Sequence, residues 1–419
     1  MTTDATIAVA MGTGVSISGQ HLDHVHAVFT RWFGKEYDLE ALDCVLSAAA
    51  AQKLAGDPCW MLVVSGSGAA KTETVMPLTA IPGTHVTSTI TGEAALLSGT
   101  AEKERAKNAT GGLLREIGED GLLVIKDVTS ILSMNRDARA AVLASLREVY
   151  DGCWVRQVGA DGGRRLTWRG RLTVIGAVTT AWDAAHAVIS VMGDRFVLVR
   201  FDSAAPRSRR AAARQALANV GHEREMRENL GEAVANLFKN IGPDAESMLT
   251  DADTEELFGL ADVVTLARTA VERDYSGNVV QAHAPEMPTR FAKQLAQIVR
   301  GGRAIGKASG DALLLAVRCA RDTMPPLRLT VLADVHAHPG SSTAAVVRRV
   351  QLPRSTVDRA LQELHLLGVL SVEKAPYGQG VQWLYSLSPA MDFRSVQRLS
   401  RNGDPHPNAM QPHLRTGPA

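Results

Sequence analysis

The chain has 419 residues, of which 45% are hydrophobic and 21% charged, so its composition is that of a soluble globular protein and not of a disordered or fibrous one. A chain of this length exceeds one compact core, and two or three domains are expected. Lys and Arg (45) nearly balance Asp and Glu (44), which excludes a global basic field; any binding of nucleic acid must come from a local patch.

The cysteines and the N-terminus indicate a cytoplasmic protein without a membrane anchor. Cys44, Cys59, Cys153 and Cys319 are scattered and form no CxxC pair, so we expect buried thiols in a reducing compartment and no zinc site. The first residues lack the basic region and apolar stretch of a secretion signal, and no apolar run is long enough to span a membrane.

The order of elements predicts an α/β fold followed by helices. Residues 1–20 are rich in Gly, Ser and Thr and are expected to be flexible, and the pattern from His21 to Gln52 is helical. Short apolar strands then alternate with helices, which indicates a parallel sheet wrapped by helices. The expected strands are Trp60–Val64, His85–Ile90, Leu122–Ile125, Leu172–Val178 and Arg195–Phe201.

These patterns divide the chain into five parts. A core with its leading helices covers residues 21–205, and an almost wholly helical part covers 206–322. Pro325-Pro326 is a natural break before a compact helical and hairpin part at 326–388. Residues 389–419 are rich in Pro and Asn and are predicted to be a disordered tail.

A loop of small residues follows the first expected strand and matches much of the phosphate-loop pattern GxxxxGK[ST]. In such loops backbone N–H groups cradle the phosphates, a lysine reaches the β- and γ-phosphates, and the next hydroxyl holds Mg²⁺. Lys71 and Thr72 stand correctly for these roles, but Ser65 and Ala70 replace the two glycines, so an ordinary Gly/Ser turn stays an alternative. The candidate nucleotide-binding residues are Ser65, Gly66, Ser67, Gly68, Ala69, Ala70, Lys71 and Thr72.

An acid follows a second apolar strand, where a Walker B motif is expected. The strand Gly121–Ile125 is followed by Lys126 and Asp127. In that motif the first acid supports Mg²⁺ and the second polarises the attacking water. Lys126 occupies the first position, so either the register slips by one and Asp127 serves the metal, or the metal acid is absent. A core strand that ends in a surface Lys-Asp pair is the alternative.

The segment from Ser145 to Asp183 carries the most specific likeness. It reads as a helix, two strands joined by a Gly-rich turn, and a buried strand that ends at Thr179-Thr180. This order resembles AAA+ ATPases with a hairpin before sensor 1, such as enhancer-binding transcriptional activators, MoxR-type ATPases and minichromosome-maintenance helicases. The chain also resembles uncharacterised bacterial and phage-borne ATPases that share Thr72-Glu73 and Lys126-Asp127.

The resemblance covers Trp60 to Phe201 well and a helical lid loosely. It implies a parallel-sheet P-loop AAA+ core with an α-helical lid, ATP and Mg²⁺ as cofactors, and a homo-oligomeric ring. By the same resemblance Thr179 falls at sensor 1 and Arg290 at sensor 2 of the lid. Arg195 falls where such proteins present an arginine finger to the γ-phosphate of the neighbouring subunit. With Asp127 these are the candidate catalytic residues, and Thr72 and Asp127 are the candidate metal ligands.

Two of these segments have alternative interpretations. Arg195 could equally be a salt-bridged surface residue before the last strand. The hairpin before sensor 1 carries arginines that suit contact with DNA or a partner protein, or it has a solvated basic tip. These arginines are Arg156, Arg164, Arg165 and Arg169.

Residues Leu327 to Leu387 fit a winged helix-turn-helix. Helices are expected at Leu327–His336, from Ser342 to Val350 and from about Arg354, followed by strands Val369–Lys374 and Val381–Leu387 around a wing loop at 375–380. Polar residues on the second and third helices suit base edges and phosphates, although such domains also bind proteins. The candidate DNA-binding residues are Arg348, Arg349, Ser355, Thr356, Arg359 and Gln362.

The leading hypothesis is a DNA-associated ATPase that remodels DNA or a DNA-bound partner, as in replication initiation or helicase action. A second hypothesis is a nucleotide-binding winged-helix regulator with little or no ATPase activity. Ser65, Ala70, Lys126 and Thr179 favour the second, because each departs from the family's catalytic pattern. A purely structural scaffold is the third, and it would leave the Lys71-Thr72 pair idle.

Overall fold

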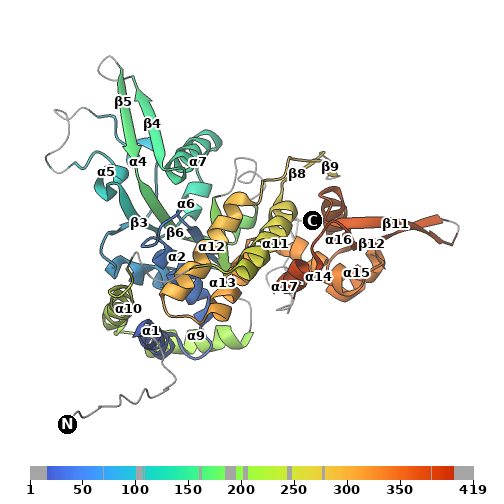
Figure 1. Cartoon of the computed structure of the whole chain (residues 1–419), viewed down its shortest axis with the longest axis horizontal. Helices are drawn as coiled ribbons and strands as arrows, with labels where there is room; N and C mark the ends of the chain where they lie inside the picture. The colour runs from blue at the N-terminus through green and yellow to red at the C-terminus, as the bar shows by residue number, and fades with distance from the viewer. Residues whose placement is uncertain are drawn as a thin grey trace, which may run out of the picture.

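The computed structural model describes residues 17–68, 70–100, 107, 109–159, 163–184, 195–201, 206–242, 248–275, 279–378 and 380–400. Figure 1 shows an α/β body, a hairpin that projects from it and a smaller unit beside it at the C-terminal end of the chain. Among the described residues, none of the helices combines the length and the apolarity needed to cross a bilayer.

The body is built on a five-stranded parallel sheet, which confirms the predicted α/β class. The strand order is β2-β3-β6-β1-β7, and all four pairings are parallel. The strands are β1 (Trp60–Ser65), β2 (Thr84–Thr87), β3 (Asp120–Ile125), β6 (Arg171–Thr179) and β7 (Phe196–Arg200). β1 and β7 are buried throughout, as expected of parallel strands covered on both faces.

Helices pack on both faces of the sheet, because successive side chains of a strand point to opposite faces. Met61 and Val63 of β1 belong to one apolar cluster and Trp60, Leu62 and Val64 to the other. The first cluster includes side chains of α1 (Ile17–Phe33), α2 (Leu39–Ala51) and α10 (Glu223–Phe238). The second includes α7 (Arg136–Tyr150) and the short helices α4 (Glu93–Leu96), α5 (Leu113–Ile117) and α6 (Thr129–Leu132).

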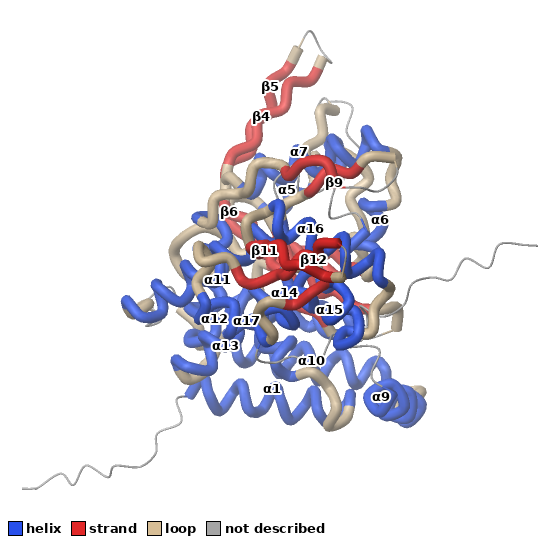
Figure 2. Tube along the Cα trace, turned by 90° about the vertical axis from the view of Figure 1, so that its right-hand side faces the viewer, coloured by secondary structure: helices blue, strands red, loops and turns tan. Residues whose placement is uncertain are grey.

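The hairpin β4 (Cys153–Val158) and β5 (Arg164–Arg169) forms where the sequence predicts it. It projects away from the sheet in both Figure 1 and Figure 2. Its residues alternate between an inner face, with Trp154, Leu166 and Trp168 in the core, and an exposed outer face. Arg156 lies on the inner face and pairs with Glu93 at 3.7 Å, so it anchors the hairpin to α4 and adds no charge to the outer face.

The helical part contains α9 (Pro206–Ala218), α10, α11 (Asp251–Arg268), α12 (Thr289–Ala304) and α13 (Ser309–Thr323). α12 packs closely on α2, because small residues meet there: a Cβ atom at Gly301 would overlap the backbone of Ser47.

The expectation of an almost wholly helical 206–322 is wrong at one place. A two-stranded hairpin, β8 (Val271–Arg273) and β9 (Val279–Ala282), lies against α16.

The outer edge of β7 is closed by the C-terminal end of α13. The backbone N–H groups of Leu198 and Arg200 donate to the side chains of Thr323 (3.0 Å) and Asp322 (2.8 Å). Arg200 also forms a bidentate pair with Asp183. Side chains thus satisfy two backbone donors of an edge strand that would otherwise be unpaired.

The C-terminal unit contains three helices and a three-stranded sheet of order β10-β12-β11. Its elements are α14 (Pro326–Ala337), β10 (Ser341–Ser342), α15 (Thr343–Val350), α16 (Arg354–Leu366), β11 (Leu370–Tyr377) and β12 (Gly380–Leu387). The side chain of Ser342 caps α15, as predicted. β11 and β12 continue through most of the expected loop at 375–380, since Pro376 pairs with Val381 and Tyr377 pairs with Gly380.

Both end segments that were predicted to be flexible contain helical residues. α1 begins at Ile17, within the predicted lead-in, because its first turn packs against Gly306, where a Cβ atom would overlap Gly19. α17 (Phe393–Ser400) occupies the start of the predicted tail. Asp392 caps it by accepting the N–H of Ser395 at 2.9 Å, and Val396 and Leu399 are buried. Residues 401–419 lie outside the described residues.

Asp322→Ala is expected to lower the free energy of unfolding by about 3 kcal/mol. The substitution removes the carboxylate that accepts the backbone N–H of Arg200 and pairs with the buried guanidinium of Arg318. Arg318 then keeps its pairs with Asp38 and Glu40. Urea denaturation measures the change.

The control is Arg224→Ala, which removes a pair with Glu228 whose partners are both exposed. That variant should lose less than about 1 kcal/mol. Equal stability of the two variants would show that Asp322 does not hold the sheet edge.

Candidate functional site

The loop after β1 has the backbone shape of a tight strand-to-helix turn. β1 ends at Ser65, and α3 (Lys71–Val75) begins six residues later and continues into the 3-10 helix η1 (Met76–Ala80). Gly68 (φ 78°) and Ala70 (φ 56°) both have left-handed backbone angles. The predicted residue Ala69 lies outside the described residues. Ala70 is thus strained where a glycine would not be.

Lys71 is folded back onto the loop. Its Nζ atom donates to the carbonyl oxygens of Ser65 (3.0 Å) and Gly66 (2.6 Å) and to the Ser65 hydroxyl (3.1 Å). An ammonium group has three donors, so these acceptors satisfy it fully. Burial lowers the pKa of Lys71, and the nearby charge of Asp127 opposes that shift. Ser65 therefore supplies a side-chain acceptor that the usual glycine lacks.

The carboxyl ends of the neighbouring strands bring Asp127 and Thr179 to the same edge. Ser65 of β1 and Thr179 of β6 are partners in the parallel ladder. The Thr129 hydroxyl lies 3.4 Å from that of Thr179, and the Thr129 N–H donates to Asp127 Oδ1 at 2.9 Å. Thr129 thus connects the two predicted residues, a role that the sequence analysis missed because no motif marks that position.

A cavity of about 560 Å³ opens beside Thr72 and Lys126, between the segment after the loop and α10. Thr72 is exposed there. Lys126 lines the same cavity, so an ammonium group stands where a metal-binding carboxylate would be expected. Glu73, next to Thr72, accepts hydrogen bonds from Arg227 of α10, the shortest at 2.8 Å.

A second cavity, of about 550 Å³, also borders the loop. Ser67, Gly68 and Ala70 form one wall, and α9 and α10 form another. Aromatic rings at the end of α1 and just after it complete the cavity, with Trp32, Phe33 and Tyr37 among its lining residues. Tyr37 shares a hydrogen bond of 2.8 Å with Thr74 of α3, and burial raises the pKa of its phenol.

This aromatic cavity is within the size range of small-ligand sites. No sequence motif marks this cavity, because its walls come from α1 and from the region around α9, which matched no motif. The available signal was three aromatic residues between Trp32 and Tyr37 in a chain with only 5% aromatics.

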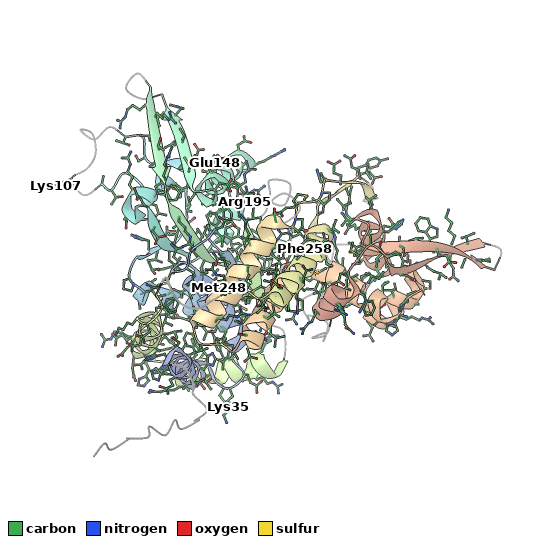
Figure 3. All side chains as sticks on the ribbon, in the orientation of Figure 1. Lys35, Lys107, Glu148, Arg195, Met248 and Phe258 are labelled. Atoms are coloured by element: carbon green, nitrogen blue, oxygen red, sulfur yellow. The ribbon has the colours of Figure 1, made fainter. Side chains whose placement is uncertain are left out.

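Arg195 and Arg290 lie at the opposite edge of the sheet. Phe196 pairs with Trp60, the first residue of β1, whereas the loop follows the last residue of the same strand. Arg195 is labelled in Figure 3, between α7 and the start of α12. Its side chain is 12% exposed and lies 3.5 Å from Asp151. Arg290 pairs with Glu286 at 3.1 Å, and its charge lowers the pKa of Arg195 in addition to burial.

The five residues of β1 beyond Trp60 span roughly 16 Å. Neither arginine can therefore touch a ligand held by Lys71 of the same chain. For Arg290 this argues against the sensor 2 position within one subunit. Arg195 could reach such a ligand only across an interface between subunits, and within the chain it forms a pair with Asp151.

The residues predicted to contact DNA gather on α15 and α16 of the C-terminal unit. Arg348, Ser355 and Arg359 are exposed, and Thr356 and Gln362 are half-buried. The Gln362 amide donates to Asp358 at 2.8 Å. Arg349 is engaged within the unit, since it forms two hydrogen bonds of 2.8 and 2.7 Å with Asp334. Its guanidinium thus joins α15 to α14.

Ala70→Gly is expected to raise the free energy of unfolding by about 0.5–1 kcal/mol, because glycine relieves the left-handed strain but costs more chain entropy. Thermal or urea unfolding measures it. Ala140→Gly, in the middle of α7, is the matched control and should lower stability by about 1 kcal/mol. A loss in both variants would contradict strain at Ala70.

Comparison with known proteins assigns the chain to no family. No protein-family model matches the sequence, and no curated protein matches it. The function of this site must therefore be argued from its geometry.

Proposed function

We propose that this protein is a P-loop ATPase of the AAA+ type that acts on DNA through a C-terminal winged helix. One observation carries the proposal: Lys71 lies in a tight loop at the carboxyl edge of a parallel sheet, and at the same edge Thr179 ends β6 and Asp127 follows β3. Ligands of open α/β sheets bind outside the carboxyl ends of the strands. The strand order β2-β3-β6-β1-β7, with a hairpin before β6, agrees with the resemblance in the sequence.

The residues present fit ATP with Mg²⁺. Lys71 is held by three uncharged oxygens, which phosphate oxygens can replace with a gain in charge attraction. The aromatic cavity next to the loop suits a base and ribose, and Thr72 offers an exposed hydroxyl for the metal. Bound Mg²⁺ would neutralise the phosphate charge. Asp127, exposed at the end of β3, is the carboxylate placed to orient water.

Completion of the site requires a second subunit. Arg195 lies at the opposite edge of the sheet, so it can meet a γ-phosphate only across an interface, as an arginine finger does. Its contact with Asp151 must open for that purpose. A head-to-tail interface of this kind forms a ring when its rotation closes. The proposal therefore includes a homo-oligomeric ring and a cytoplasmic location beside DNA.

The DNA-binding part of the proposal rests on the C-terminal unit. Three helices followed by a long hairpin are the elements of a winged helix, and α16 takes the place of the recognition helix. Arg348, Arg354 and Arg359 are exposed along α15 and α16 in a chain of nearly balanced charge. They supply the local basic patch that phosphate contacts need.

The alternative is a nucleotide-binding regulator that hydrolyses ATP slowly or not at all. Two observations favour it. Lys126 brings positive charge to the cavity beside Thr72, and Lys71 is fully satisfied without phosphate. Both features reduce the gain from Mg²⁺ and nucleotide.

Wild-type protein is expected to hydrolyse ATP with Mg²⁺, and DNA is expected to stimulate the rate. Lys71→Ala should abolish nucleotide binding, and Asp127→Asn should keep binding but stop turnover. Steady-state phosphate release and nucleotide titration measure the two properties. Nucleotide binding without turnover in the wild type would support the regulator instead.

A mixing experiment tests the subunit interface in the same assay. Arg195→Ala and Lys71→Ala should each be inactive alone. Mixed in equal amounts they should recover about a quarter of the wild-type rate, because one head-to-tail interface in four pairs an intact Lys71 with an intact Arg195. An active Arg195→Ala protein would exclude the finger.

Arg359→Ala is expected to weaken DNA binding uniformly and to reduce the salt dependence by about one ion, while nucleotide affinity is unchanged. Fluorescence anisotropy at several salt concentrations measures it. Arg224→Ala, which removes an exposed arginine of α10, is the control and should bind DNA as the wild type does. Equal effects of the two substitutions would place the DNA elsewhere.

A further inference from the structure

One of the six tryptophans is exposed. Trp32, Trp60, Trp154, Trp168 and Trp182 are each at most 6% exposed. Trp383, on β12 of the C-terminal hairpin, is 45% exposed. A large aromatic ring gains free energy from burial, and exposed apolar groups of this size often mark a binding surface.

The exposed ring belongs to a face that is buried at its base. Trp383 and Tyr385 are two residues apart on β12, so their side chains are on the same face of the hairpin. Tyr385 is buried against the helices, with its hydroxyl near Thr343 at the start of α15. Two residues further out, the same face passes the end of the helices and is uncovered. Figure 1 shows the hairpin extending well beyond the unit.

The uncovered face combines apolar groups with a cation. Trp383 pairs across the strands with Lys374, whose Nζ atom lies 5.9 Å from the centre of the ring, and Val381 pairs with Pro376. Val381 is also exposed. Glu373 is the acidic residue of this hairpin. It directly precedes Lys374 in β11, so its side chain is on the other face. The chemistry of this face is therefore a flat ring flanked by positive charge.

The surroundings favour nucleic acid over a protein as the ligand of this face. Thr343, which contacts Tyr385, also lies 3.4 Å from Asp358 of α16, so the base of the face adjoins the N-terminal half of that helix. Arg354, Ser355 and Arg359 are exposed on the same half of α16. Arginines beside an exposed aromatic ring are the combination that single-stranded nucleic acids bind, by phosphate contact and base stacking.

We propose that Trp383 stacks on an unpaired nucleobase and that Lys374 contacts the adjoining phosphate, so the C-terminal unit binds single-stranded DNA or the single-stranded arm of a junction. This inference deepens the proposed DNA-binding function and rests on it. A base inside an intact duplex is stacked on its neighbours and does not present its face to the ring.

The test uses the full-length protein and three fluorescein-labelled probes: oligothymidylate, a blunt duplex and a fork with a thymidylate arm. Anisotropy gives the affinities. Trp383→Ala should weaken binding of oligothymidylate and of the fork by about tenfold, with the duplex unchanged. Trp383→Phe, which keeps a stacking ring, should retain most of the affinity.

Phe258→Ala is the matched control, because Phe258 is an exposed aromatic on α11, away from the hairpin (Figure 3). It should not alter binding of any probe. Acrylamide quenching gives a second measurement, since Trp383 is the tryptophan open to the quencher. Unlabelled oligothymidylate should protect it.

Three outcomes would overturn the proposal. The stacking role is excluded if Trp383→Ala binds oligothymidylate as tightly as the wild type does, or if bound oligothymidylate leaves Trp383 of the wild type open to acrylamide. DNA binding by the unit would then still stand. An equal loss for the duplex in Trp383→Ala makes the hairpin a duplex contact. If the wild type binds none of the three probes, the DNA-binding function is removed as well.

Discussion

The buried carboxylate of Asp322 is the constraint on which the arrangement at the site depends. It accepts the backbone N–H of Arg200 at 2.8 Å, and it lies 3.5 Å from the guanidinium of Arg318. Arg318 in turn pairs with Asp38 at 2.8 Å, and Asp38 caps α2 and lines the aromatic cavity. One carboxylate thus fixes the edge strand, the helical part and one wall of the cavity together, since each buried charge in the set needs its partner.

A second set of buried charges joins the C-terminal unit to the body. Arg328 of α14 donates to the backbone oxygens of Ala267 (2.8 Å) and Thr269 (2.7 Å), and its Nε donates to Glu363 of α16 at 2.8 Å. Glu363 also pairs with Arg273 of β8. The helix proposed to read DNA is therefore held on the body by buried hydrogen bonds and not by a loose linker. Movement of this unit would have to break contacts that are costly to leave unsatisfied.

Local patterns predicted the elements, and long-range packing decided what they form. The buried strands, the β4–β5 hairpin and the helices of the C-terminal unit were readable because burial and periodicity are properties of short segments. The position of Arg290 could not be predicted from such patterns, because it depends on which end of α12 meets the sheet. α17 was missed because a Pro- and Asn-rich composition hid the cap at Asp392 and the apolar pair Val396 and Leu399. The aromatic cavity needs α1, α9 and α10 together, which no single motif encodes.

The two departures from the phosphate-loop pattern act on the same equilibrium. The Ser65 hydroxyl gives Lys71 a third acceptor, so the loop is satisfied with no phosphate present. The left-handed backbone at Ala70 stores strain in that same loop, which a ligand that reshapes the backbone can relieve. The Ser65 hydroxyl favours the loop without nucleotide, and the strain at Ala70 favours a change of the loop backbone when a ligand binds. Nucleotide affinity is then set by the difference between them, so the sequence departures by themselves do not mark the loop as inactive.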